Sequence, residues 1–217
     1  HRIRLYVFST QTPTLRGTSL SADAGNGAAQ VKAICIKKGI TLVSLESPGM
    51  WHQVGFLADA FQVFKQHSMS VDLVSTSETN VTVSLDPAAN TLDNAVLEAL
   101  LVDLAKLCRA RVIGPCASVS LVGRNIRAIL HRLGEAFELF EEQKIYLVSQ
   151  AANDLNFTFV VDERQGDRLV TQLHDLLIHA APDDPVMGPT WEQLFSGPTA
   201  AQPAAQPPWW RSKRAVL

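Results

Sequence analysis

Residues 41–86 read TLVSLESPGMWHQVGFLADAFQVFKQHSMSVDLVSTSETNVTVSLD. Within this stretch the spacing of apolar residues changes from alternation to a helical period and back to alternation, which predicts strand, helix, strand and strand. A further helical pattern follows and completes the order βαββα. The expected elements are strand Thr41–Glu46, a helix near Val54–Gln66, strands Ser70–Ser77 and Val81–Asp86, and helix Leu92–Cys108.

The same order of elements returns in the second half of the chain, although the residues themselves are not repeated. A βαββαβ unit forms an antiparallel sheet with both helices on one face. The sequence therefore predicts an α+β fold of two ferredoxin-like βαββαβ modules packed side by side. The expected elements of the second copy are strand Ala117–Val122, helix Ile126–Gln143, strands Ile145–Gln150 and Leu155–Val161, and helix Arg164–His179.

The segments outside the two repeats differ from them in composition. Between Ala29 and Glu46 the signal is mixed, and Lys32–Lys38 and Ile40–Leu45 are interpreted as two separate strands. Proline, alanine, glycine and glutamine dominate the tail, which is typical of a linker. The predicted organisation is an exit segment of a preceding domain (1–28), a strand or helix segment (29–46), a first module (47–116), a second module (117–181) and a Pro-rich linker (182–217).

Composition excludes several classes of partner. A net charge of -2 gives no field that would collect nucleic acid or an anionic membrane, and an RNA-binding domain of this fold would need an aromatic-rich strand. No apolar run approaches the roughly 20 residues that a membrane span requires. The three cysteines lack CxxC spacing, which argues against a disulfide framework or a structural zinc site. We expect reduced thiols in a cytoplasmic protein.

Catalytic motifs are missing from the sequence. It contains no Gly-rich phosphate loop, no GxSxG elbow and no HExxH motif, and its six histidines are scattered rather than paired at ligand spacing. We therefore predict no catalytic residue, no metal site and no cofactor within this chain.

The loop Ser47–Leu57, which leads into the first helix, is a candidate binding site. Free N–H groups at a helix start favour a carboxylate, and Gly55 lets a ligand approach the backbone closely. On the following strand, Asp72 faces away from Val71 and Leu73, and Glu78 falls at the turn. Amides at one side and carboxylates at the other would suit a zwitterion with a second ammonium group. An ordinary connecting loop with solvated carboxylates is the alternative.

Two of these stretches resemble the regulatory region of aspartate kinases, most closely the lysine-sensitive bacterial type. Gly49–Ala58 is similar to the family's "xMLHxxGFLA" loop, and Ser70–Glu78 to its "SVDLxxTSE" strand. Pro13 with Gly17-Thr18 resembles the "PxxxGT" segment at the exit of the kinase domain. The resemblance implies two tandem ACT domains and an effector site formed by Met50, His52, Gly55, Phe56, Leu57, Val71, Asp72, Ser77 and Glu78.

The resemblance also implies partners. The first module would bind L-lysine, or threonine or another amino acid, and two copies would pair through their ACT modules. It further implies that the first module is inserted in the second, so that residues 31–46 pair with residues 117–179. ATP and Mg would belong to the kinase domain, and the Trp209–Arg214 end resembles the join in bifunctional aspartate kinase/diaminopimelate decarboxylase chains. A purely structural module that dimerises and tethers, with a degenerate pocket, is the alternative function.

Overall fold

The computed structural model describes residues 3–11, 17–20, 30–132 and 144–178. The chain divides into two compact units, one of residues 28–179 and one of residues 1–27 with 180–217. In the unit of residues 1–27 and 180–217, β1 (Leu5–Val7) pairs antiparallel with β2 (Thr18–Leu20). The predicted linker at 182–217 lies outside the described residues.

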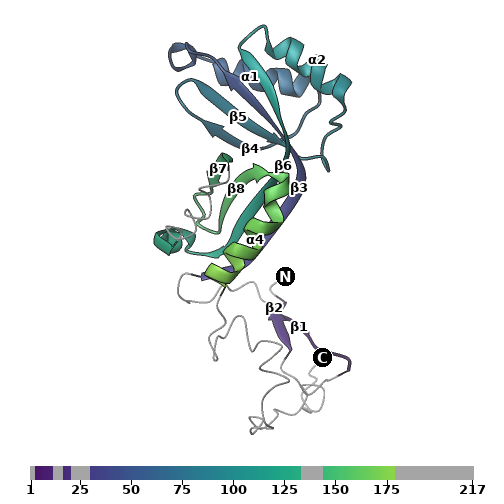
Figure 1. Cartoon of the computed structure of the whole chain (residues 1–217), viewed down its shortest axis with the longest axis vertical. Helices are drawn as coiled ribbons and strands as arrows, with labels where there is room; N and C mark the ends of the chain where they lie inside the picture. The colour runs from purple at the N-terminus through teal and green to yellow at the C-terminus, as the bar shows by residue number, and fades with distance from the viewer. Residues whose placement is uncertain (1–2, 12–16, 21–29, 133–143, 179–217) are drawn as a thin grey trace. The chain divides into compact units, whose positions relative to one another are not determined.

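The 28–179 unit is built on one six-stranded sheet with the strand order β4-β5-β3-β6-β8-β7 (Figure 1). Every neighbouring pair is antiparallel, and the four strands of each half follow the order of a ferredoxin-like unit. The predicted α+β fold class is confirmed. The elements are β3 (Gln30–Glu46), η1 (Met50–His52), α1 (Phe56–Gln66), β4 (Val71–Thr76), β5 (Asn80–Leu85), α2 (Asn94–Leu104), β6 (Arg109–Arg124), η2 (Ile126–Arg132), β7 (Ile145–Gln150), β8 (Asn156–Asp162) and α4 (Glu163–Leu177).

Strands β3 and β6 run through both halves of the sheet. Their pairing extends from Gln30 opposite Arg124 to Glu46 opposite Arg109. The two strands predicted at Lys32–Lys38 and Ile40–Leu45 are therefore one strand, β3. The prediction of a separate strand at Ala117–Val122 was wrong, because these residues form the second half of β6. The register of β3 against β6 shifts on both sides of Ile40. These bulges accommodate the residues that the sequence alone suggested as strand ends, and the pairing continues past them.

The shared strands place the first module between two parts of the second. The first half of β3 pairs with the second half of β6, which in turn pairs with β8. Residues that precede the first repeat thus supply a strand to the second repeat. The boundary predicted after residue 116 falls inside β6, where the backbone has no break.

Three clusters of buried side chains hold the unit together. One lies between α1, α2 and the first half of the sheet, and includes Phe56, Phe64 and Leu100. A second lies under α4 and includes Phe159 and Leu169. The third joins the two halves, because β4 and β7 approach each other at the ends of the sheet. Its buried members are Ile40, Leu42, Cys116, Leu147 and Val160.

The residue just before each of helices α1 and α2 determines where the helix begins. Helix α1 starts two residues after the predicted Val54, because Gly55 at φ 89° lies outside the helical region. Helix α2 is capped by Asp93, whose side chain accepts the N–H of Val96.

The helix predicted at Ile126–Gln143 begins as the 3-10 turn η2, and its residues 133–143 lie outside the described part of the chain. Among the described helices, none is long and apolar enough to cross a bilayer.

Gly123 lies close to the backbone of β3. A Cβ at this position would lie 2.0 Å from the carbonyl oxygen of Gln30, and that oxygen belongs to the backbone and cannot rotate away. We expect Gly123→Ala to destabilise the protein by about 1 to 3 kcal/mol, measured by urea unfolding. An unfolding midpoint equal to that of the unmodified chain would contradict this close approach.

Candidate functional site

The loop between β3 and α1 forms one wall of a hollow. The single 3-10 turn η1 (Met50–His52) closes on itself, with the N–H of Gln53 donating to the carbonyl of Met50 at 3.1 Å. Gly55 then reverses the chain direction at φ 89° and becomes the N-cap of α1. The local sequence thus leads the chain from the sheet to a helix entrance that faces outward.

Backbone amides are open at this entrance. Gly55 has no side chain to cap the helix, and no side chain among the described residues caps it in its place. The N–H groups of Leu57 and Ala58 lie in the first helical turn, where no intrahelical acceptor is available. Such amides, at the positive end of the helix dipole, favour an anion such as a carboxylate.

The end of β4 forms the opposite wall. The hollow has a volume of about 290 Å³, and its lining combines backbone amides, apolar side chains and two hydroxyls. A hollow of this size can take a small amino acid. The lining residues are Met50, Gln53, Gly55, Phe56, Leu57, Thr76 and Ser77.

The structure brings together only part of the predicted site. Among the predicted residues, those that line the hollow are Met50, Gly55, Phe56, Leu57 and Ser77. Gln53 and Thr76 also line it and were not predicted, although both lie inside the two stretches that carry the family resemblance.

The other predicted residues are not part of the lining. His52 is exposed, with its ring against Trp51. Val71 packs against the core beneath α1, and Asp72 is exposed at the start of β4, whereas Thr76 lies at its end. Glu78 is exposed in the turn after β4. Within one chain, neither Asp72 nor Glu78 is among the residues that line the hollow.

The corresponding loop of the second module is closed by the chain itself. Asp154, in the turn between β7 and β8, accepts the N–H of Arg127 through Oδ1 at 2.8 Å. Its other carboxylate oxygen lies 3.4 Å from Nε of Arg127, and its backbone carbonyl accepts the N–H of Ile126 at 3.2 Å. The carboxylate and the backbone carbonyl of Asp154 thus each accept one amide at the start of η2.

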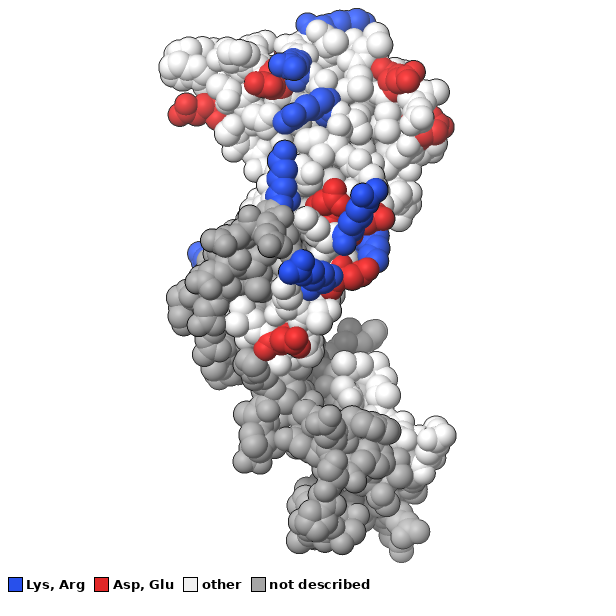
Figure 2. Space-filling model, viewed as in Figure 1, with Lys and Arg blue, Asp and Glu red and all other residues white. Residues whose placement is uncertain are grey.

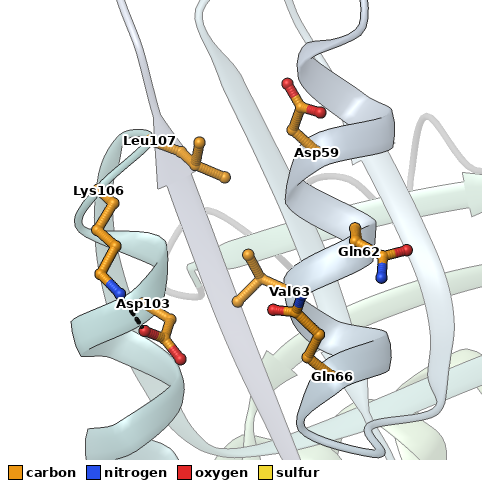
Figure 3. Close-up of a pocket in the computed structure, with 7 residues that line it drawn as sticks. All are labelled: Asp59, Gln62, Val63, Gln66, Asp103, Lys106 and Leu107. Carbon is orange, nitrogen blue, oxygen red and sulfur yellow. Dashed lines mark hydrogen bonds and ion pairs between the residues drawn. The ribbon is translucent and has the colours of Figure 1, made fainter.

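A second hollow, of about 270 Å³, lies between α1 and α2 (Figure 3). Its carboxylate Asp103 is already paired, with Nζ of Lys106 at 2.7 Å and Nε2 of His67 at 2.8 Å. These partners, the lysine first, hold the pKa of Asp103 below its ordinary value. The pairing with His67 ties the two helices together and gives this hollow a structural role. Over the described residues, no three metal-ligating side chains come together.

Comparison with known proteins places these features in context. No protein-family model matches the sequence. Lysine-sensitive aspartokinase 3 of Escherichia coli (strain K12) is 31% identical over 177 residues, which are 81% of this chain and 39% of that protein. The crystal structure of E. coli aspartokinase III in complex with lysine and aspartate matches 82% of this chain and 40% of that chain, with a TM-score of 0.64 and 30% identity.

In sequence and in fold, this chain is related to the regulatory region of aspartokinases. The regulatory subunit of aspartate kinase from Thermus flavus shares the fold at 15% identity and a TM-score of 0.57, over 68% of this chain and 98% of that subunit. The chain spans about two fifths of the length of the E. coli aspartokinase that it matches.

Gly55 holds the helix entrance in place. Its φ of 89° is strained for any residue with a Cβ, although a Cβ there would meet no atom within 4 Å. We expect Gly55→Ala to cost about 1 to 2 kcal/mol of stability through backbone strain alone, measured by urea unfolding. Gly49→Ala is the matched control, because Gly49 has φ -95° and equally open surroundings, and it should be neutral. Equal effects of the two substitutions would contradict this assignment.

Proposed function

We propose that this chain is an allosteric, amino-acid-sensing regulatory region of an aspartate kinase, and that lysine is its effector in feedback inhibition of lysine, threonine and methionine biosynthesis. The observation that carries the proposal is the hollow in which the open amides of α1 face Thr76 and Ser77. Its support is the similarity to an aspartokinase crystallised with lysine. In this proposal, phosphotransfer with ATP and Mg belongs to a kinase domain outside this chain.

The lining matches one end of an amino acid. The α-carboxylate would accept a hydrogen bond from the amide of Leu57, whose N–H has no intrahelical acceptor, and the aliphatic chain would lie against Met50. Charge-assisted hydrogen bonds of this kind contribute about 1.5 to 3 kcal/mol each when desolvated. The ammonium groups still need a carboxylate, which the lining does not contain.

A second copy of the chain would supply that carboxylate. Strand β4 is one of the two outer strands of the sheet, and Val74 at its middle is 41% exposed. If two copies pair antiparallel around Val74, Asp72 of one copy lies opposite Thr76 of the other. Within one chain these residues are about 13 Å apart at about 3.3 Å per residue, so pairing is what would complete the site. It would also cover the exposed strand edge.

Effector binding would control activity through the arrangement of the two copies. A ligand held between them favours the arrangement that it contacts on both sides. Differential affinity of this kind typically supplies about 1 to 3 kcal/mol of coupling. An attached kinase would then be disabled only in the effector-bound arrangement.

Calorimetric titration with lysine, threonine and methionine tests the effector assignment. We expect lysine to bind and Asp72→Ala to weaken it about 10- to 150-fold, because one charge-assisted bond is lost. Replacing Glu98, an exposed carboxylate on α2, by Ala is the control and should leave the affinity for lysine unchanged.

The absence of a binding signal with all three amino acids would refute the sensor function. Lysine binding that is unaffected by Asp72→Ala would remove Asp72 from the site, and silence with retained dimerisation would favour the structural tethering function.

Pairing through β4 has its own test. Val74→Lys places two like charges across the proposed strand pair, where they repel each other. We expect this variant to sediment as a monomer in analytical ultracentrifugation and to lose lysine binding at the same time. Val102→Lys is the control, because Val102 is 65% exposed on α2, away from β4. Lysine binding by a monomeric variant would contradict a site shared between copies.

A further inference from the structure

Three consecutive residues of β3 bind to both modules. Nζ of Lys37 bonds Asp86, which follows β5 in the first module. Nζ of Lys38 lies 2.6 Å from Oδ2 of Asp167 on α4, in the second module. Figure 2 shows acidic and basic side chains lying side by side near the middle of the 28–179 unit.

Gly39 bonds the second module through its backbone and lies near the first. Its N–H donates to Oε2 of Glu163, in the first turn of α4, at 2.6 Å. It adopts φ +74°, and a Cβ at this position would lie 3.3 Å from Cγ of Pro87, which follows β5. The register of β3 against β6 shifts immediately beside it. Such a bulge is a point at which a strand can bend without losing its neighbours.

A second set of hydrogen bonds connects this region to the strand that reaches the hollow. Asn90 accepts the N–H of Ser70 at 2.6 Å and donates to the carbonyl of Ser70 at 3.0 Å. The same amide donates to the backbone carbonyl of Asp86 at 2.9 Å. Strand β4 begins at the residue after Ser70 and ends at Thr76 in the lining of the hollow.

Charge strengthens the first-module side of this network. The hydrogen bond to Asp86 raises the pKa of Lys37, and the nearby charges of Asp86 and Asp72 raise it further. The same hydrogen bond lowers the pKa of Asp86. Both groups therefore remain ionised at neutral pH. Lys37 is in addition attracted to Asp72, the carboxylate that the proposed function assigns to the effector.

We propose that Lys37, Lys38 and Gly39 form a joint that transmits effector binding from the first module to α4 of the second. The inference rests on the proposed function, since the hollow must take a ligand. A ligand drawn between the α1 entrance and Thr76 shifts β4, and Ser70, Asn90 and Asp86 carry the shift to Lys37. The bulge at Gly39 then alters the first turn of α4 through Glu163. Each step passes between groups that are in direct contact, which is what coupling across a packed protein requires.

Hydrogen exchange of the chain with and without lysine tests the joint. We expect lysine to slow amide exchange in the first two turns of α4 by about five-fold or more, although α4 lies in the other module. Lys37→Met and Glu163→Ala interrupt the joint from its two sides and should abolish this slowing. Glu163→Ala should leave the affinity for lysine within about two-fold. Lys106→Met is the control, because it removes an ion pair confined to the first module and should preserve the response.

The outcomes separate the two proposals. No heat of binding with any amino acid refutes the sensor function, and the joint then has no signal to transmit. Lysine binding with unchanged exchange in α4 of the unmodified chain overturns the joint and leaves the sensor function in place. A response of α4 that survives both Lys37→Met and Glu163→Ala likewise overturns it. Circular dichroism confirms that each variant is folded before it is compared.

Discussion

The antiparallel pairing of β3 with β6 is the constraint on which the rest of this structure depends. The two strands are paired from Gln30 and Arg124 at one end to Glu46 and Arg109 at the other. Each half of this strand pair is flanked by its own outer strands and covered by its own helices. Two hydrophobic cores therefore pack on one continuous antiparallel sheet. A change in the bend of these strands must therefore alter how the two modules face each other.

The two modules use the same topology differently at their helix entrances. In the first, Gly55 leaves amides open beside a hollow. In the second, Asp154 accepts the equivalent hydrogen bonds from within the chain. Backbone amides at a helix start need an acceptor, whether this is water, a ligand or a side chain. The presence of an internal carboxylate in one module and its absence at the other entrance gives a physical reason why only the first is proposed to sense an amino acid.

Sequence periodicity was sufficient for the parts of the fold that are governed by local spacing. The helix near Val54–Gln66 and strands at Ser70–Ser77 and Val81–Asp86 lie within a few residues of α1, β4 and β5. Periodicity failed at residues 30–46 and 109–124, because Gly39 and Pro115 look like strand breaks when read alone. Only the partner strand shows that bulges absorb them. Long-range pairing of this kind has no local signature.

The candidate site was predictable to the same extent. Gly55 and the helix start were recognisable from one short stretch, whereas the position of Asp72 depended on the length of β4, which carries it away from Thr76. Gln53 and Thr76 lie within the two stretches that resemble the family, but those stretches do not distinguish lining residues from their neighbours, and the folded hollow does.

Shared strands also limit how such a protein can be divided or recombined. Removing the second module would strip half of β3 and half of β6 of their neighbours, and excising the first would cut both strands at their centre. Neither module is a portable part that could be exchanged between enzymes by a simple crossover. The strands that the two halves share favour their unfolding together.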